Sequence, residues 1–237
     1  MIGQWIEVAL FKKSPEQVAK DADMKDGFIN VAVAALITAV ITSILAGIGA
    51  VVSGGLAGGL AGAGIGIVGA IFGFIFAIIF APILSVIGLA IMAGIVHIVA
   101  KILGGKGSYG SMVGTMGVIG ASITMTYMLA LSIISGIIGI FAIGPIVFLV
   151  AIISIPIALA QFIASLVELY LAIRGIAAVQ KLSLIKAALA VLIPIAILVI
   201  IGIIIAIIIV IISIVLGATF LTALAGSSGL EGLFGLM

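Results

Sequence analysis

Two ionisable residues lie in or beside long apolar stretches of this 237-residue sequence, and chemistry would centre on them. His97 is the only histidine, and Glu168 is the only acidic residue inside an apolar run. A lone histidine is a poor metal site, although its ordinary pKa of about 6.5 suits a proton-sensitive contact. An ionisable side chain inside a membrane is by default a functional hypothesis. We predict that His97 and Glu168 contact each other across two helices.

The remaining residue types do not supply a catalytic constellation. The chain has no cysteine, and five of its seven acidic residues lie within the first 26 positions. Nucleophilic triads, paired carboxylates and thiolate metal sites cannot be assembled from such a set. We therefore expect no enzyme activity, no cofactor and no metal. The net charge of +2 does not point to a nucleic-acid partner.

Two sets of polar residues recur at helical spacing and so define polar helix faces. The face that includes Glu168 is predicted to point into a helical bundle or a water-filled cavity. It either makes hydrogen bonds between helices or forms part of a transport pathway. The second face is expected to lie against the first. The first set is Ser154, Gln161, Ser165 and Glu168, and the second is Ser111, Thr115, Ser122 and Thr126.

The composition places these residues in a membrane protein. Hydrophobic residues make up 66% of the chain and charged residues 7%, against about 25% charged in soluble domains. A run of about 20 apolar residues can cross a bilayer, and residues 190–216 contain no charge. The alternating polarity of a membrane β-barrel does not occur. We predict an all-α fold, a polytopic membrane helical bundle.

About five transmembrane helices are predicted, with one broken or re-entrant segment. The apolar block 65–103 is too long for one crossing, so we place a break at Pro82. Residues 65–80 then form a half-helix, an interfacial segment or a sixth span. The remaining chain is divided into an amphipathic cytoplasmic segment, 1–26, a bundle, 27–217, and a glycine-rich tail, 218–237. The predicted spans are 27–52, 82–103, 112–141, 146–173 and 184–216.

The basic residues orient the bundle. They fall in three regions that five spans would bring to one face. The positive-inside rule makes this face cytoplasmic. We expect a protein of the cell membrane with its N-terminus inside and its C-terminus outside. The three regions hold Lys12, Lys13, Lys20 and Lys25; Lys101 and Lys106; and Arg174, Lys181 and Lys186.

The stretch "HIVAKILGGKGSYG" (97–110) is predicted to be a basic helical hairpin at the inner interface. His97 and Lys101 share a helix face. Gly104 and Gly105 end the helix, and Ser108 caps the next one. This stretch and the polar face supply the candidate functional residues: His97, Lys101, Gly104, Gly105, Lys106, Gly107, Gln161, Ser165, Glu168 and Arg174.

The same stretch resembles the signature of the prokaryotic and archaeal branch of the Yip1-domain family of membrane proteins. "KKSPEQVAK" (12–20) and "ELYLAIRGIAAVQKLSLIKAALAVLIP" (168–194) are similar to two further parts of that family. The resemblance implies five spans, a cytoplasmic N-terminus and a role related to membrane trafficking. The Asp-Leu-Tyr-Gly-Pro motif of the eukaryotic branch is missing, which argues against small-GTPase binding. The long isoleucine runs also fit an archaeal source.

Three functions follow from these observations. The first is a non-enzymatic scaffold or membrane-organising factor that acts through helix-face contacts with lipid, with a second copy or with another membrane protein. Closely spaced glycines in 54–73 favour such contacts. The second is a small transporter or channel that uses the polar face around Glu168. The third is an accessory subunit of a larger membrane complex.

Overall fold

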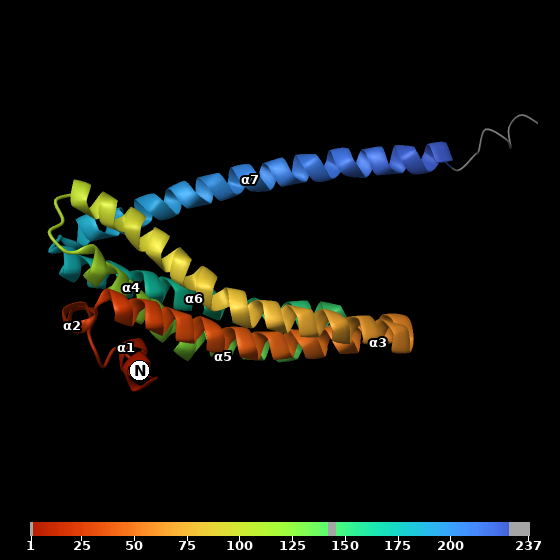
Figure 1. The fold of residues 1–237 in the computed structure, drawn as a ribbon, viewed down its shortest axis with the longest axis horizontal. Helices are drawn as coiled ribbons and strands as arrows, with labels where there is room; N and C mark the ends of the chain where they lie inside the picture. The colour runs from red at the N-terminus through yellow and green to blue at the C-terminus, as the bar shows by residue number, and fades with distance from the viewer. Residues whose placement is uncertain (1, 142–145, 228–237) are drawn as a thin grey trace, which may run out of the picture. The chain divides into compact units, whose positions relative to one another are not determined.

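The computed structural model describes residues 2–141 and 146–227, with side chains described up to Ile214 and at Leu216. Helices make up all the regular structure within these limits, as predicted (Figure 1). Two short helices, α1 and α2, precede the longer ones, and a π-helical turn, η1, links α4 to α5. The elements are α1 Ile2–Ala9, α2 Pro15–Asp21, α3 Met24–Ile102, α4 Tyr109–Ile123, η1 Thr124–Met128, α5 Leu129–Ile140, α6 Ile146–Gln180 and α7 Leu184–Ser227.

Among the described residues, four helical segments are long and apolar enough to cross a membrane: α3, the segment 109–140 that contains α4 and α5, α6, and residues 184–214 of α7. Together with the composition, they indicate a membrane protein in contact with lipid. The chain divides into two units, 1–191 and 192–237. The second unit begins within α7, and most of its described side chains are exposed. The helix extends beyond the predicted end of the bundle at 217, and residues 228–237 of the predicted tail lie outside the described part.

Helix α3 is folded back on itself at Gly58 and Gly59. Gly59 has φ +58° and ψ −143°, a conformation that glycine adopts without steric cost. The two legs, 24–57 and 60–102, run antiparallel (Figure 1). Near the turn they touch through backbone, because a Cβ at Gly62 would collide with the carbonyl group of Gly54.

The predicted break at Pro82 is therefore wrong. Pro82 lies inside the second leg, which stays helical on both sides of it. Residues 65–80 are part of that leg and not a separate half-helix. A proline removes one backbone hydrogen bond, whereas reversing the chain between two close antiparallel helices needs backbone angles that glycine adopts easily.

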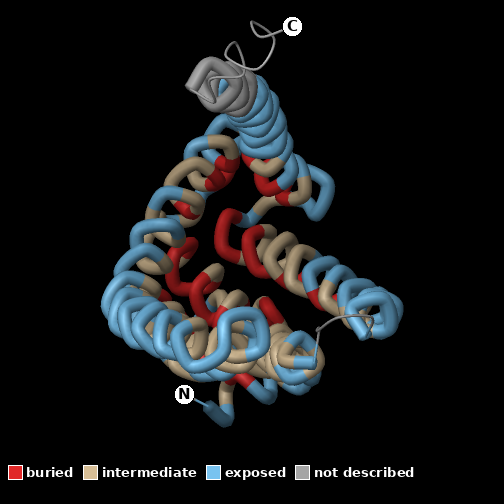
Figure 2. The backbone as a smooth tube through the Cα atoms, turned by 90° about the vertical axis from the view of Figure 1, so that its right-hand side faces the viewer, coloured by how far each residue is buried: buried red, intermediate tan, exposed pale blue. Residues whose placement is uncertain are grey.

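Helix α4 packs closely against the start of the first leg, and α6 packs against α4. A Cβ at Gly114 would meet the backbone of Asp23, and one at Gly117 would meet Gly27. Gly175 of α6 lies against the side chains of Thr115 and Ile119 of α4. Figure 2 shows the buried residues on the sides of the helices that face one another. Glycine thus sets the distance between helix backbones.

The N-terminal helices also pack on this bundle. Trp5 is 2% exposed and donates a hydrogen bond from its Nε1 to Oδ1 of buried Asn30. Val8 and Val18 belong to a hydrophobic cluster with residues of α4 and α6, and the Tyr127 hydroxyl donates to the Ala9 carbonyl at 3.0 Å. The predicted amphipathic segment therefore forms two helices, α1 and α2, that are anchored to the bundle.

We expect Gly114→Ala to lower the free energy of unfolding by about 1–3 kcal/mol, the usual cost of overpacking. The added Cβ would collide with the backbone of Asp23, and backbone cannot rotate away. Thermal unfolding in detergent measures the change. Gly139→Ala is the matched control, because no atom lies within 4 Å of a Cβ at that position. Equal losses from both substitutions would contradict the close packing at Gly114.

Candidate functional site

Gln180, the last residue of α6, holds together the loops at one end of the first unit. Its side chain is fully buried. Its Nε2 lies 3.0 Å from Nδ1 of His97, and its Oε1 accepts a hydrogen bond from the Gly107 amide at 3.1 Å. Its backbone carbonyl accepts another from the Lys106 amide at 2.9 Å. The loop after α3 is therefore attached to the end of α6.

The glycines of "LGGKGS" are explained by this attachment. Gly104 has φ +96°, which disfavours other residues. A Cβ at Gly105 would lie 2.7 Å from Oε1 of Gln180, and one at Gly107 would collide with the Val179 carbonyl. The Ser108 hydroxyl accepts a hydrogen bond from the Ser111 amide at 3.2 Å and thereby caps the N-terminus of α4. The prediction of a glycine-terminated helix followed by a serine-capped helix is confirmed.

The predicted contact between His97 and Glu168 is wrong. His97 faces Gln180 and also packs edge-on against Tyr109, with ring centroids 5.9 Å apart. Gln180 lies twelve residues after Glu168, about 18 Å farther along the helix. His97 therefore contributes to the attachment of the loop. Gln180 could not be recognised as a functional residue from the sequence, because its position beside Lys181 is typical of a solvated helix end.

The three basic regions lie at one end of the first unit, as predicted; we call this the basic end. Lys186 donates from Nζ to the Leu103 carbonyl at 3.2 Å, which joins the second and third regions. Arg174 forms an ion pair with Glu16 at 2.6 Å, which joins the third region to the first. Lys101 and Lys106 are exposed there. Arg174 also lies 5.9 Å from the ring of Tyr170.

A second site lies deeper, where the two legs of α3 separate. A cavity of about 620 Å³ opens between both legs and α4, and Glu168 of α6 contributes to its lining. We call it the Glu168 cavity. Its other polar side chains are hydroxyls, and most of the remaining lining is alanine, glycine and methionine. The hydroxyl residues are Thr38, Thr42, Ser85 and Thr124.

Glu168 is the only charged residue that lines this cavity. Among the described residues its carboxylate makes no ion pair and no side-chain hydrogen bond. It lies beside Gly120, where a Cβ would be 3.4 Å from Oε1 of Glu168. The Oγ1 atom of Thr38 is buried without a hydrogen-bond partner, although Thr42 donates to the Thr38 carbonyl at 2.7 Å. Two polar groups of the cavity thus have unused hydrogen-bonding capacity.

The other residues of the first polar face do not reach the cavity. Ser154 and Ser165 donate to carbonyls of their own helix, at 2.7 Å and 3.0 Å. Ser165 is exposed and Gln161 is half-buried. The expected hydrogen bonds between helices are therefore not made by these serines. The 3.6-residue spacing of polar residues shows that they share one helix face. It cannot show which of them lines a cavity between the helices.

The second polar face agrees in part with its prediction. Thr115 lies against Gly175 of α6, and Thr126 lines a small cavity with Ala160 and Ala164 of α6. Ser122 instead donates to the Val118 carbonyl of its own helix at 2.6 Å. Thr124, which lines the Glu168 cavity, begins the π-helical turn η1. Such turns often occur at functional sites, and the sequence did not predict this one.

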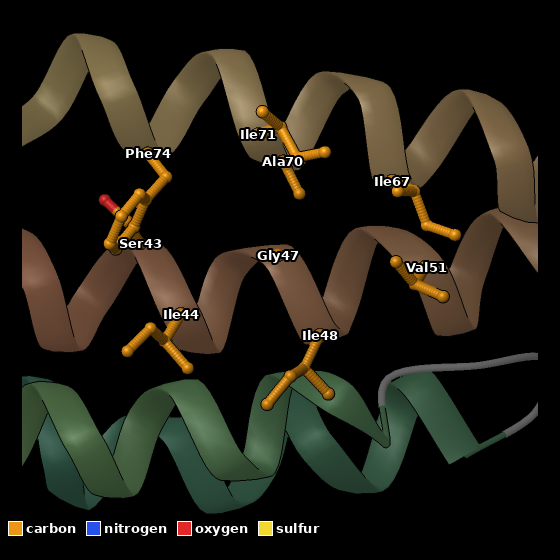
Figure 3. A pocket seen from close by; sticks show the side chains of 9 residues that line it. All are labelled: Ser43, Ile44, Gly47, Ile48, Val51, Ile67, Ala70, Ile71 and Phe74. Atoms are coloured by element: carbon orange, nitrogen blue, oxygen red, sulfur yellow. The ribbon is translucent and has the colours of Figure 1, made fainter.

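A further cavity of about 450 Å³ lies between the two legs near their turn. Figure 3 shows that its lining side chains come from both legs. Ser43 is the only polar side chain among them, and the other residues are aliphatic, glycine or phenylalanine. This cavity therefore offers apolar contact and no group for chemistry. In the described ranges, no three His, Asp or Glu residues are grouped closely enough to hold a metal ion.

Comparisons with protein-family models, with curated proteins and with solved structures find no match for this chain. The arrangement of residues at the two sites is therefore the basis for a functional hypothesis.

We expect Gln180→Leu to lower the free energy of unfolding by about 1–3 kcal/mol, because it removes the hydrogen-bond partner of the part-buried Gly107 amide. Unfolding in detergent measures the loss, and faster proteolysis of loop 103–108 should accompany it. Gln161→Leu is the matched control, since the side chain of Gln161 makes no hydrogen bond in the described structure. A loss of the same size in the control would contradict the role given to Gln180.

We expect docking of the N-terminal helices to weaken in acid. Partial burial raises the pKa of Glu16. This effect is outweighed by hydrogen bonds from its own backbone amide, Ser14 and Arg174 and by the Arg174 charge, so the pKa lies below the ordinary value. The ion pair therefore stabilises docking at neutral pH, and this stabilisation is lost as pH falls through the lowered pKa.

Fluorescence of Trp5, the only tryptophan, measures this docking. Its emission should shift to longer wavelength as pH falls from 7 to 3. Glu16→Gln should remove the part of this transition that comes from the ion pair. Glu7→Gln is the control, because Glu7 is exposed and makes no ion pair among the described residues. Identical pH curves for wild type and Glu16→Gln would contradict the prediction.

Proposed function

We propose that this chain is an integral membrane protein that crosses the bilayer five times. The crossings are the two legs of α3, the segment 109–140, α6 and α7. The uncharged turn at Gly58–Gly59 would face the outside, and the basic end would face the cytoplasm. The grouping of basic residues at one end supports this orientation, because cytoplasmic loops carry an excess of Lys and Arg. The N-terminus is then inside and the C-terminus outside.

The function that the geometry supports best is the binding and passage of a small organic cation, as in a small transporter. The observation that carries this proposal is the Glu168 carboxylate, which lines a cavity of about 620 Å³ between helices and has no cationic side chain of the described residues beside it. Charged groups inside membranes are costly and mark substrate or ion pathways. A cationic ligand would offset that cost.

The size and lining of the cavity narrow the ligand class. Its volume lies in the range of small-molecule sites, about 300–1,000 Å³, and is larger than a bare metal ion or a proton requires. Alanine, glycine and methionine side chains suit an apolar body, and the hydroxyl of Thr38 offers one unused hydrogen-bonding group. We therefore propose a cation with an apolar body, and no catalytic step, since none of the described residues that line the cavity with Glu168 is a second acid, a histidine or a lysine.

Binding of tetraphenylphosphonium to the purified protein in detergent tests this proposal. Glu168→Gln should weaken binding about tenfold or more, because the negative charge that attracts the cation is lost. Tetraphenylborate, with the same shape and the opposite charge, should not bind to the wild type. Glu168→Asp should retain part of the affinity, and Gln161→Leu, on the same helix, should retain all of it.

Equal binding of the two ions, or unchanged tetraphenylphosphonium binding by a folded Glu168→Gln variant, would overturn the cation site. Uptake of the same ion into proteoliposomes then distinguishes passage from binding alone. A variant that binds the ion and fails to move it would reduce the proposal to a receptor or storage site.

A second candidate is the scaffold, either as a Yip1-type protein or as an accessory subunit. One observation favours it. Gly62 and Gly66 are used in the contact between the legs, but Gly69 and Gly73 on the second leg have nothing within 4 Å. Glycines four apart allow close approach of another membrane helix, such as that of a second copy. A scaffold would be indifferent to Glu168→Gln, so the same variant separates the two candidates.

A further inference from the structure

Four lysines come together at the basic end from two loops that are far apart in sequence. Lys101 and Lys106 lie at the end of α3 and in the following loop, and Lys181 and Lys186 lie on either side of the start of α7. All four are exposed. We call this group the four-lysine site.

The contacts between the two loops fix this grouping. Nζ of Lys186 donates to the Leu103 carbonyl at 3.2 Å, so its ammonium group lies over the loop after α3. The Lys106 amide donates to the Gln180 carbonyl at 2.9 Å, which places Lys106 next to Lys181. Lys181 has φ +53°, a left-handed conformation at the point where the chain turns from α6 into α7.

No acidic side chain balances these charges in the part of the chain that the structure describes. The two ion pairs found there are Lys13–Asp21 and Arg174–Glu16. Beyond residue 26, the acids of the sequence are Glu168 and Glu231. Glu168 lines the deeper cavity, and Glu231 lies outside the described residues. The four-lysine site therefore has a strong net positive charge, in contrast to the N-terminal helices, where acids and lysines alternate.

Exposed apolar side chains flank the lysines on the same two helices. Ile98 and Ile102 lie within a turn of Lys101, and Leu184 and Ile185 directly precede Lys186. Ile102 is 78% exposed and Ile185 is 76% exposed. A ligand that contacts both sets of side chains has an anionic head and an apolar body. A membrane lipid presents these two parts in this order across the interface.

We propose that the four-lysine site binds the phosphate headgroup of an anionic membrane lipid, with the lipid's acyl chains against the flanking isoleucines and leucine. Lysine ammonium groups bind phosphate as flexible point charges with three donors each. Basic pockets at the cytoplasmic ends of membrane helices bind anionic headgroups in this way. The first amides of α7 add donors that the helix itself leaves unpaired. This proposal does not depend on the Glu168 cavity.

Native mass spectrometry of the delipidated full-length chain in detergent tests the proposal, with phosphatidylglycerol as the probe and phosphatidylcholine as the neutral comparison. The wild type should bind phosphatidylglycerol in preference to phosphatidylcholine. The variant with Lys101→Gln, Lys106→Gln, Lys181→Gln and Lys186→Gln should lose about tenfold or more of this binding. The corresponding four Lys→Arg substitutions keep the charge and should keep the binding, and thermal unfolding of the glutamine variant excludes loss through misfolding.

The matched control replaces the same number of lysines at the same end, with Lys12→Gln, Lys13→Gln, Lys20→Gln and Lys25→Gln. It should retain phosphatidylglycerol binding within about threefold. Equal losses in the two glutamine variants would overturn the site in favour of general surface charge. Displacement of the lipid by millimolar inorganic phosphate would overturn the lipid assignment and indicate a soluble anion.

Discussion

Close approach of helix backbones at glycine is the constraint on which the rest of this structure depends. Lipid tails are as apolar as leucine, so helices in a membrane are held together by packing and not by exclusion of water. In this chain helix backbones come so close that an added Cβ would collide with the facing backbone, at Gly54 with Gly62, at Gly27 with Gly117 and at Gly114 with Asp23. The two legs of α3 touch near their turn, and α4 touches the start of the first leg. Away from their turn the two legs diverge (Figure 1), and the Glu168 cavity is lined by both of them.

The sequence predicts the fold class and the helices well, because both depend on local properties. Apolar runs mark the long helices, and the basic residues mark one end of the bundle. The chain reverses at Gly58 and Gly59, between the first two predicted spans, but a further break was placed at Pro82 because proline is the more familiar helix breaker. Hydropathy alone cannot distinguish a glycine-rich helix from a glycine turn, and 54–66 contains both. The deciding information is the pairing of Gly62 with Gly54 and of Gly66 with Ala50, which is a property of two segments together.

Individual residues of the candidate sites could be predicted from the sequence, but their partners could not. Glu168 is recognisable because it is an acid in an apolar run, and the structure places it in a cavity. The partner of His97 was not predictable, because Gln180 reaches it from a helix end 83 positions away. The same holds for Thr38, which is an ordinary membrane-helix threonine in sequence and an unpartnered cavity group in the structure. Residue type shows where charge occurs, but the packing of several helices decides which groups meet.

The charges of this protein are separated by depth, and that separation connects the two proposed binding sites. In the proposed orientation the lysines of the basic end would stand in water and headgroups, where a charge costs little and an anion is available from the lipid. Glu168 lies six residues inside Arg174, about 9 Å along the helix, and the described residues around it supply no compensating cation. A carboxylate at that depth is stable only if it is neutralised, by a proton or by a ligand. A positive field at the membrane surface repels a cation that approaches from the same side. Headgroup phosphates bound by the four lysines would reduce that field, so lipid at the surface would ease the entry of a cation to the interior site.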